Sequence, residues 1–457
     1  MTVLPGVLSH SPKNIPELLK SGSLKVAVAG YGGFETPLAY AYGRIGARVS
    51  IVDMDACSVE SFVNMIIGSR YASAISRFLR SGIVNIASDR IKALTESDVI
   101  DVFAPIRFSE LGQPDYSMLH KLSEEVGRSL GEGKLIISST ITPPGMTEDV
   151  IMNILEKSSG LKVGDSFGLA YSPYEPLPIE RSDSTIRILA AVDRRSLDIA
   201  EAIISTVYGG RILKIDNIRY AEAIKLFDSA SKYILYTFTY ELLEVCGKLG
   251  LDHGSLNYAL EVLHSSYSLL PVWSYLSGNT RLLLDLCEAY KFKPRILNAA
   301  LKVGEGISRI YLSMVREAAR QIGKPLRKCR VALIGLSDRA YTCEGVVSSP
   351  TIDLALRLRK IGAFVKVFDP YRLGSKLDKV GIKISRRLEE CLEDTDIIVI
   401  LPESKVMKTI MMKKLGVAKA LAQTSLAIID LAGVIDRVEA SRLGFIYVGL
   451  DGALHAG

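Results

Sequence analysis

The 457-residue chain has little that would indicate a metal centre, a disulfide framework or a membrane anchor. Its six cysteines stand far apart, with no C-x-x-C pair and no cysteine–histidine cluster at metal-ligand spacing. No apolar run reaches the ~18 residues that a membrane-spanning helix needs. The N-terminal residues also lack the ordered charged and apolar regions of a signal peptide. We therefore expect no metal, no membrane association, and a reducing cytoplasmic location with free thiols.

An excess of charge of one sign is also missing. The 56 basic and 50 acidic residues leave a net charge of +6, and no arginine-rich or lysine-rich block occurs. Charge therefore gives no support for nucleic-acid binding, although a phosphate-bearing ligand is compatible with it. The 48% of hydrophobic residues is typical of a folded chain, and at ~100 to 200 residues per domain the length predicts two or three domains.

Short apolar runs alternate with helical segments through the first part of the chain. The runs lie at 24–30, 99–105, 134–140, 167–173 and 186–192. Such alternation predicts a mostly parallel sheet with helices on both faces. Long helical periodicity follows at 221–250 and 294–323, and the strand–helix alternation resumes at 330.

This order predicts an α/β fold in which two doubly wound Rossmann-like domains are joined by a central helical domain. We place the three domains at 1–215, 216–326 and 327–457. The outer two repeat one pattern, a strand ending in glycine, a helix and a strand ending in aspartate. Because open α/β sheets bind ligands at the carboxyl ends of their strands, we expect two nucleotide-like ligands facing each other.

The first of these patterns has the features of a dinucleotide site. Gly30-Tyr31-Gly32 lies between a predicted strand and a helix, where backbone N–H groups and the helix dipole can hold a pyrophosphate. Asp53 ends the next strand, where a carboxylate grips the adenosine ribose, which favours NAD over NADP. The third glycine of G-x-G-x-x-G is replaced by Glu35, and Gly33 partly compensates. The alternative is a glycine turn that only packs helix on sheet.

Three further polar positions could carry chemistry. Ser139-Thr140 follows the apolar run KLII, as either a cleft hydroxyl or the cap of the next helix. Glu175 follows another strand and could act as a base or bind substrate. Lys225 lies on the helix AEAIKLF, where it would stabilise an oxyanion if buried, or remain a solvated charge if exposed.

Taken together, the motifs resemble those of the UDP-glucose/GDP-mannose dehydrogenase family. The resemblance extends over nearly the whole chain and rests on the order of segments such as VAVAGYGGFETPLA, SSTITPPGMTE, AEAIKLFDSASKY, KPRILNAALKVGEG and DTDIIVILP. It implies NAD-dependent oxidation of the C6 alcohol of a UDP- or GDP-linked sugar. The family's first domain binds NAD, its central helices form a homodimer, and its last domain binds the nucleotide sugar.

The resemblance also implies roles for single residues. Gly30, Gly32 and Asp53 match the dinucleotide motif, and Pro105 matches the proline after the fourth strand. Thr140 matches a threonine that helps to position water near the sugar. Lys225 matches the lysine that stabilises negative charge on the substrate oxygen.

Several family positions differ here. The slot of the nucleophilic cysteine falls near Tyr275, and Cys287, about twelve residues later, is interpreted as a core residue. The remaining substitutions give Asn279 for the partner aspartate, Ser229 for the helix asparagine, Tyr174 followed by Glu175 for the glutamate of SPE, and Arg339 for the basic loop that holds the nucleotide sugar. Without the thiol, the thioester route to a uronate is closed. The sequence therefore leaves two main hypotheses, a dehydrogenase with incomplete or weak oxidation, or an inactive nucleotide-binding paralogue with a regulatory or scaffolding role. A third, a two-domain NAD enzyme that acts on small hydroxy acids, fits the alternation of strands and helices but not the third domain.

Overall fold

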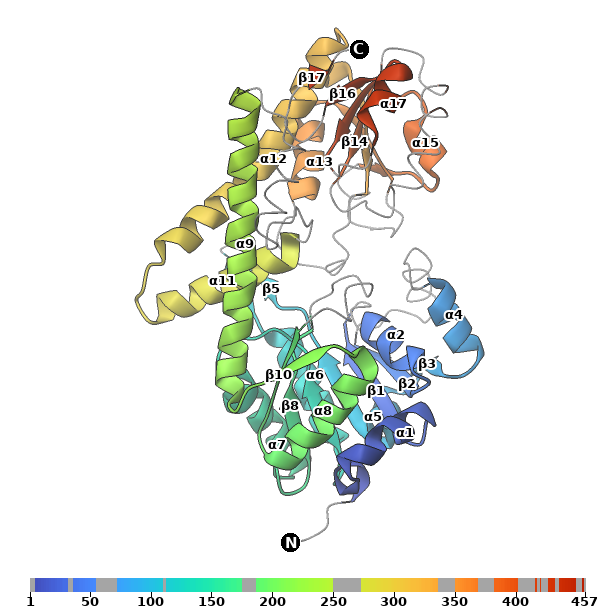
Figure 1. Cartoon of the computed structure of the whole chain (residues 1–457), viewed down its shortest axis with the longest axis vertical. Coiled ribbons are helices and arrows are strands. Elements are labelled where there is room, and N and C mark those ends of the chain that lie inside the picture. The colour runs from blue at the N-terminus through green and yellow to red at the C-terminus, as the bar shows by residue number, and fades with distance from the viewer. Residues whose placement is uncertain are drawn as a thin grey trace. The chain divides into compact units, whose positions relative to one another are not determined.

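The computed structural model (Figure 1) describes most of the chain. The described residues are 5–31, 36–54, 72–109, 112–174, 186–249, 273–335, 350–368, 382–401, 416, 420, 426–431, 435–448 and 454–455. They divide between two compact units. The first unit is mainly Met1–Ser229 with Arg281–Phe292, and the second comprises Ala230–Thr280, Lys293–Thr342 and Val347–Gly457.

The first unit is built on a sheet with the strand order β10-β9-β8-β7-β4-β1-β2-β3. Its strands are β1 (Lys25–Gly30), β2 (Arg48–Asp53), β3 (Val84–Ile86), β4 (Val99–Phe103), β7 (Leu135–Ser138), β8 (Gly168–Tyr171), β9 (Ile186–Ala191) and β10 (Arg211–Lys214). Neighbouring strands in it are parallel except β8 and β9. Strands β4 and β7 are buried along their whole length, as expected of a sheet covered on both faces. The predicted strands and the mostly parallel sheet are confirmed.

Helices cover both faces of this sheet. On one face, α6 (Ser117–Arg128) and α7 (Met152–Ser159) pack together over an apolar core that includes Val102, Ile136 and Leu169. The second group contains α2 (Thr36–Arg44) and α8 (Arg194–Tyr208), which contact each other. The remaining elements are α1 (Ile15–Lys20), α4 (Ala72–Arg80), α5 (Arg90–Glu96), the hairpin β5 (Arg107–Phe108) and β6 (Pro114–Asp115), and a π-helical turn over Met146–Ile151.

The second unit contains a sheet with the order β13-β12-β11-β14-β15-β16-β17. Its strands are β11 (Arg330–Ile334), β12 (Phe364–Phe368), β13 (Lys383–Ile384), β14 (Ile397–Ile400), β15 (Ala427–Asp430), β16 (Ile446–Val448) and β17 (Leu454–His455), of which β17 alone pairs antiparallel. Its helices include α13 (Pro350–Ile361), α15 (Leu388–Leu392) and α17 (Arg437–Arg442). The central order β13-β12-β11-β14 repeats β3-β2-β1-β4 of the first unit, so the two predicted Rossmann-like sheets are confirmed.

The structure describes three long helices in the middle of the sequence, of which the first and the last were predicted. They are α9 (Ile218–Leu249), α11 (Trp273–Ala289) and α12 (Arg295–Gln321). The two units divide α9 between them after Ser229, and they divide α11 after Thr280. In the second unit α12 packs on α13 and on the strands β14, β15 and β16.

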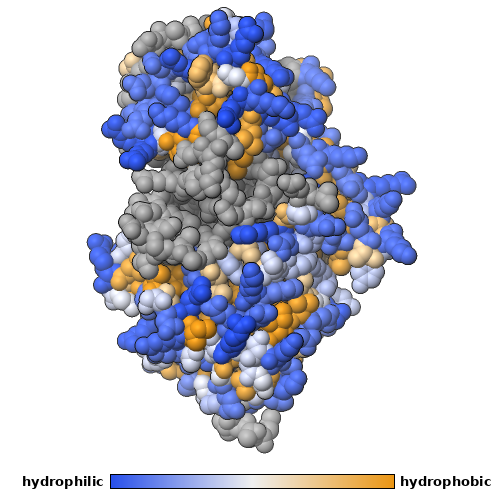
Figure 2. All heavy atoms as spheres, turned by 180° about the vertical axis from the view of Figure 1, so that it is seen from behind, coloured by the Kyte–Doolittle hydropathy of each residue, from blue (hydrophilic) through white to orange (hydrophobic). Residues whose placement is uncertain are grey.

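Hydrophobic residues that remain at the surface lie in patches among hydrophilic ones on the face seen in Figure 2.

Helices α9 and α12 approach closely in the second unit through buried tyrosines. The hydroxyl groups of Tyr240 and Tyr311 lie 2.6 Å apart, and Tyr236 donates to Tyr240 at 3.2 Å. Gly304 permits this approach, because a Cβ atom there would lie 1.9 Å from the hydroxyl oxygen of the buried Tyr233. The packing of α9 against α12 therefore requires glycine at position 304.

Replacing Gly304 by alanine is expected to lower the free energy of unfolding by about 1 to 3 kcal/mol, as overpacking does. The matched control is Gly306→Ala in the same helix, where an added Cβ meets nothing within 4 Å. That variant should gain up to ~1 kcal/mol from helix propensity. Urea unfolding followed by circular dichroism measures both, and equal stability changes in the two variants would contradict the packing argument.

Candidate functional site

The end of β1 lies between the ends of β2 and β4. In the sheet register Gly30 pairs with Asp53 on one side and with Phe103 on the other. The backbone N–H of Met54 donates to the carbonyl of Gly30 at 2.8 Å. The predicted glycine and carboxylate of the dinucleotide motif are therefore neighbours at the carboxyl edge of the sheet, an arrangement that fits an adenosine ribose and a pyrophosphate.

Other members of the predicted cofactor motif are placed differently. Tyr31 is 6% exposed and packs in the apolar core with Val52 and Val102, so its ring is part of that core. Gly32 and Gly33 lie outside the described residues, as does Glu35.

Thr140 joins the ends of β7 and β4. Its Oγ1 accepts a hydrogen bond of 2.9 Å from the backbone N–H of Ala104, the residue before Pro105, and the side chain is 2% exposed. The neighbouring Ser139 donates from Oγ to Asp101 at 2.6 Å. These bonds contradict the alternative in which the two hydroxyls cap the next helix, since both are directed to β4 and the residues after it.

Sequence reasoning missed Asp101, which lies within β4 and is fully buried. Its carboxylate accepts hydrogen bonds from Ser139 Oγ and, at 3.1 Å, from the hydroxyl of Tyr42. Burial raises the pKa of Asp101 to about 6, and the two hydrogen bonds oppose that rise. The available signal was an acidic residue inside the otherwise apolar run VIDVF.

Lys225 is buried on α9, with 7% of its surface exposed. Its Nζ donates to Asp228 Oδ2 at 3.1 Å. The alternative of a solvated charge is therefore wrong. Asp228 is more exposed, with 40% of its side chain accessible to solvent. The ion pair therefore lies near the protein surface, although the Lys225 side chain is buried.

The segments that contain Pro105, Thr140 and Lys225 contact one another through an apolar cluster. Ile141, Leu226 and Leu282 form its buried centre, and Ile106 packs against them. Three of these residues directly follow predicted site residues in the sequence. The structure thus assembles the end of β4, the end of β7 and the first turns of α9, three segments that lie far apart in the sequence.

A second buried carboxylate, also missed by sequence reasoning, lies beside this cluster. Glu222 of α9 is 0% exposed and accepts hydrogen bonds from the segment after Thr140. Burial raises its pKa, while the hydrogen bonds from Thr147, Gly145 and Thr142 act in the opposite direction. The sequence signal was an acidic residue on the apolar helix AEAIKLF.

Known proteins match both units. The NAD binding domain of the UDP-glucose/GDP-mannose dehydrogenase family matches residues 24–185, and the UDP binding domain of the same family matches residues 334–437. Together the two matches cover more than half of the sequence. The chain belongs to this family. The NAD binding domain lies wholly within the first unit and contains Gly30, Asp53, Pro105 and Thr140.

Individual dehydrogenases of this family are distant relatives in sequence. A UDP-N-acetyl-D-glucosamine 6-dehydrogenase of Pseudomonas aeruginosa is 24% identical over 358 residues, covering 76% of this chain and 83% of that enzyme. A UDP-glucose 6-dehydrogenase of Rickettsia typhi is 24% identical over 443 residues, covering 92% and 97%. The solved structure of a UDP-D-ManNAc dehydrogenase from Pyrococcus horikoshii has the same fold, with a TM-score of 0.70, 21% identity, and coverage of 94% of this chain and 99% of that one.

The structure describes some of the other positions to which the resemblance assigns a role. Ser229 is 0% exposed at the end of the first unit's share of α9, and Asn279 is 5% exposed on α11 in the second unit. Tyr275, near which we expect the family's cysteine position, also lies on α11. Glu175 and Arg339 lie outside the residues that the structure describes.

The interpretation of Cys287 as a core residue is wrong. Its side chain is partly exposed near the end of α11, and burial of the part that is covered raises the pKa of the thiol. A raised pKa reduces the thiolate, which is the nucleophilic form. Among the described residues no group of three metal-ligating side chains occurs, and no described helix is long and apolar enough to span a membrane.

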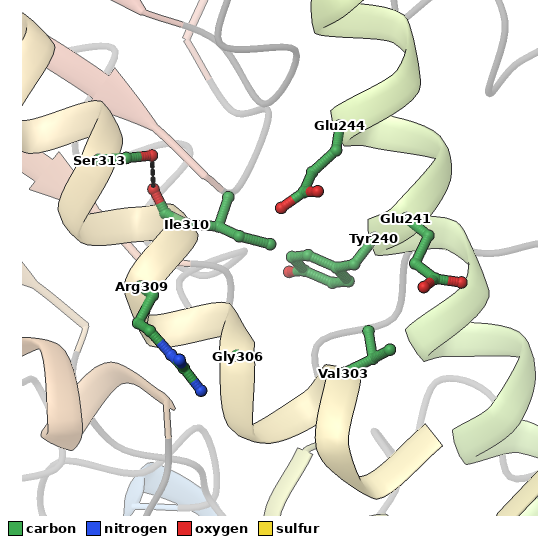
Figure 3. Close-up of a pocket in the computed structure, with 8 residues that line it drawn as sticks. All are labelled: Tyr240, Glu241, Glu244, Val303, Gly306, Arg309, Ile310 and Ser313. Carbon is green, nitrogen blue, oxygen red and sulfur yellow. Dashed lines mark hydrogen bonds between the residues drawn. The ribbon is translucent and has the colours of Figure 1, made fainter. Parts of the chain in front are cut away.

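A groove of about 440 Å³ lies in the second unit between α9 and α12 (Figure 3). Figure 3 shows Tyr240 and Glu244 on α9 facing Ile310 on α12. None of the site residues predicted from the sequence lines it. The residues that line the groove are therefore different from those of the candidate site.

Proposed function

We propose that this protein oxidises the C6 hydroxyl of a UDP- or GDP-linked sugar with NAD as the hydride acceptor. The observation that carries the proposal is the burial of Lys225 on α9, beside the apolar cluster that follows Thr140 and Pro105. A buried ammonium is a donor for an oxygen that becomes negatively charged as the C6 hydride leaves.

Different residues of the chain bind the cofactor, stabilise charge and accept the proton in the proposed reaction. Gly30 and Asp53 hold the cofactor at the carboxyl edge of the sheet. Lys225 stabilises the developing charge on the substrate oxygen, and its pairing with Asp228 at 3.1 Å orients the ammonium. Thr140, fixed by the N–H of Ala104, positions a water or sugar hydroxyl. NAD supplies the acceptor for the hydride, and Glu175 is the candidate base for the hydroxyl proton.

We propose further that oxidation stops at the aldehyde. One hydride passes from C6 to NAD and one proton leaves the hydroxyl, so the alcohol loses two electrons and two hydrogens. A second oxidation through a thioester needs a nucleophilic thiol. The expected position of that thiol falls near Tyr275, in a stretch without cysteine, and the raised pKa of Cys287 makes it a poor substitute.

The test is a panel of UDP-glucose, UDP-N-acetylmannosamine and GDP-mannose mixed with purified protein and NAD. NADH absorbance gives turnover, calorimetry gives binding, and mass spectrometry of the sugar gives its oxidation state. We expect one NADH for each sugar consumed, with Cys287→Ser giving the same ratio. Binding without NADH would refute the enzyme in favour of the nucleotide-binding paralogue, and two NADH per sugar would refute the aldehyde as end product.

We also propose a homodimer formed through α9. Large exposed hydrophobic residues on this helix recur at spacings of seven, eleven, seven and four residues, namely Tyr220, Phe227, Phe238, Val245 and Leu249. Such spacing keeps side chains on one face of a helix. Light scattering tests the proposal, with a mass about twice the 49.9 kDa of the chain expected and a monomer mass contradicting it.

The division into three domains and the cellular location of the protein are also proposals. We propose that 1–215 binds NAD, that 216–326 mediates dimerisation, and that 327–457 binds the nucleotide part of the sugar. The matches to an NAD binding and a UDP binding domain, which fall within the outer two, support this division. A cytoplasmic location is supported by Cys287, Cys329 and Cys391, which are all free thiols.

A further inference from the structure

The buried carboxylate of Glu222 binds the chain segment that follows Thr140. Its Oε1 accepts from Thr142 Oγ1 at 3.0 Å, from the backbone N–H of Thr147 at 2.9 Å and from Thr147 Oγ1 at 2.6 Å. Its Oε2 accepts from the backbone N–H of Gly145 at 2.6 Å. One side chain of α9 therefore makes four hydrogen bonds to a six-residue stretch.

The kind of donor shows what this carboxylate fixes. Two of the four donors are backbone N–H groups, which can only donate, so the position of the main chain itself depends on Glu222. Charge-assisted hydrogen bonds of this kind are stronger than neutral ones, and losing one partner of a buried group leaves the other unsatisfied. The stretch 142–147 is thus tied to α9 as backbone, whatever its side chains do.

Lys225 lies on α9 between two residues that attach this helix to the chain after Thr140. Glu222 precedes it by three residues, almost one helical turn, and Leu226, which packs against Ile141, follows it directly. The chain that leaves Thr140 is therefore attached to α9 on both sides of Lys225, by an apolar contact and by a buried carboxylate. A helix attached in this way can neither rotate nor slide relative to the end of β7 without breaking these bonds.

We infer that Glu222 is a positioning residue that fixes Lys225 in register with Thr140. The inference rests on the proposed function for the role of Lys225, but the register itself is a property of the fold. Glu222 acts through α9 and the 142–147 segment, and its own oxygens are occupied by the four donors. It is distinct from the residues that the family resemblance assigns to the reaction.

The defining experiment compares two isosteric changes of a carboxylate to an amide. In Glu222→Gln the amide nitrogen must face either the Gly145 N–H or the three donors at Oε1, so donors oppose each other. We expect kcat to fall about 10²-fold, the cost of a ~1 Å misplacement, with the Kd for NAD at the edge of β1 and β2 changed less than about twofold. The control is Asp149→Asn, because Asp149 lies two residues after this segment and also binds α9. It accepts a hydrogen bond of 2.6 Å from Arg219, but 57% of its side chain is exposed. It should keep nearly full activity, as exposed ion pairs contribute little.

A second readout does not depend on turnover. Hydrogen exchange of the 142–147 amides and the rate of acylation of Lys225 by acetic anhydride, both followed by mass spectrometry, report the tie directly. Both should rise in Glu222→Gln and stay at the wild-type level in Asp149→Asn. If the wild type makes no NADH but these readouts change as expected, the proposed function fails and the positioning role stands. Unchanged acylation and exchange in folded Glu222→Gln overturn the positioning role, whatever the activity.

A milder pair of variants covers the case in which Glu222→Gln does not fold. Thr147→Val removes one hydroxyl donor and leaves the Thr147 N–H in place, whereas Thr147→Ser keeps both. Acylation of Lys225 should increase in Thr147→Val and return to the wild-type rate in Thr147→Ser. Equal rates in Thr147→Val and the wild type would overturn the inference.

Discussion

Methionine in place of Lys225 is expected to lower kcat for the nucleotide sugar about 10²- to 10³-fold, the usual loss when one donor to a developing oxyanion is removed. Methionine fills much of the same space on α9, so Leu226 and Ile141 can stay packed. The Kd for NAD should change little, because Gly30 and Asp53 belong to other elements. Single-turnover formation of NADH, with calorimetry for NAD, measures the two effects separately.

The matched control is Lys232→Met on the same helix, where the lysine is exposed. It removes the same charge and adds the same side chain, and kcat should remain within about twofold of the wild type, as is usual for surface substitutions. A similar loss in both variants would mean that α9 needs positive charge in general, and that Lys225 has no specific role at the substrate oxygen.

Asparagine in place of Asp101 is expected to change the pH dependence of stability. The pKa of Asp101 is raised from 3.8 to about 6 in the folded protein. Between these two pH values the folded state holds a proton that the unfolded state has lost, so the free energy of unfolding falls as pH rises from about 4 to 6. The rise in pKa corresponds to roughly 3 kcal/mol, at ~1.4 kcal/mol for each pH unit.

Asp101→Asn removes this titration. Relative to the variant, the wild type should therefore be about 2 to 3 kcal/mol less stable at pH 7 than at pH 4, whatever the absolute effect of the substitution. Urea unfolding at several pH values measures the difference. Ser139→Ala provides a second variant, because it removes a hydrogen bond that lowers the pKa of Asp101. It should shift the fall in stability to higher pH, and a flat difference between the wild type and Asp101→Asn would contradict the argument.

The sequence predicted the strands and the long helices because their signals are local. Apolar runs that end in glycine or a hydroxyl residue became β1 and β7, and helical periodicity became α9 and α12. The burial of Lys225 and the hydrogen bonding of Thr140 could be stated only as alternatives, since each depends on residues far away in the sequence. The hydrogen bond from the N–H of Ala104 to Thr140 and the 7% exposure of Lys225 decided between those alternatives.

Asp101 and Glu222 were missed for a related reason. A lone acidic residue in an apolar strand or helix carries no local pattern that indicates whether hydrogen-bond donors will surround it. The donors for Glu222 come from a turn some eighty residues earlier, and two of them are backbone N–H groups that no side-chain motif encodes. Exposure was equally hard to infer, and Cys287 was placed in the core although it lies near the exposed end of α11.

The attachment of Glu222 also sets how freely this part of the sequence can vary during evolution. Thr142 and Thr147 contribute hydroxyl groups that serine could supply equally well. Gly145 has φ 94°, a backbone conformation that residues with a Cβ rarely adopt, and an added Cβ would lie 2.7 Å from Asp149 Oδ2. The other donors belong to the backbone and place no demand on side chains. Descendants that keep this geometry should therefore retain the glutamate, a glycine and two small hydroxyl residues, while the intervening positions change.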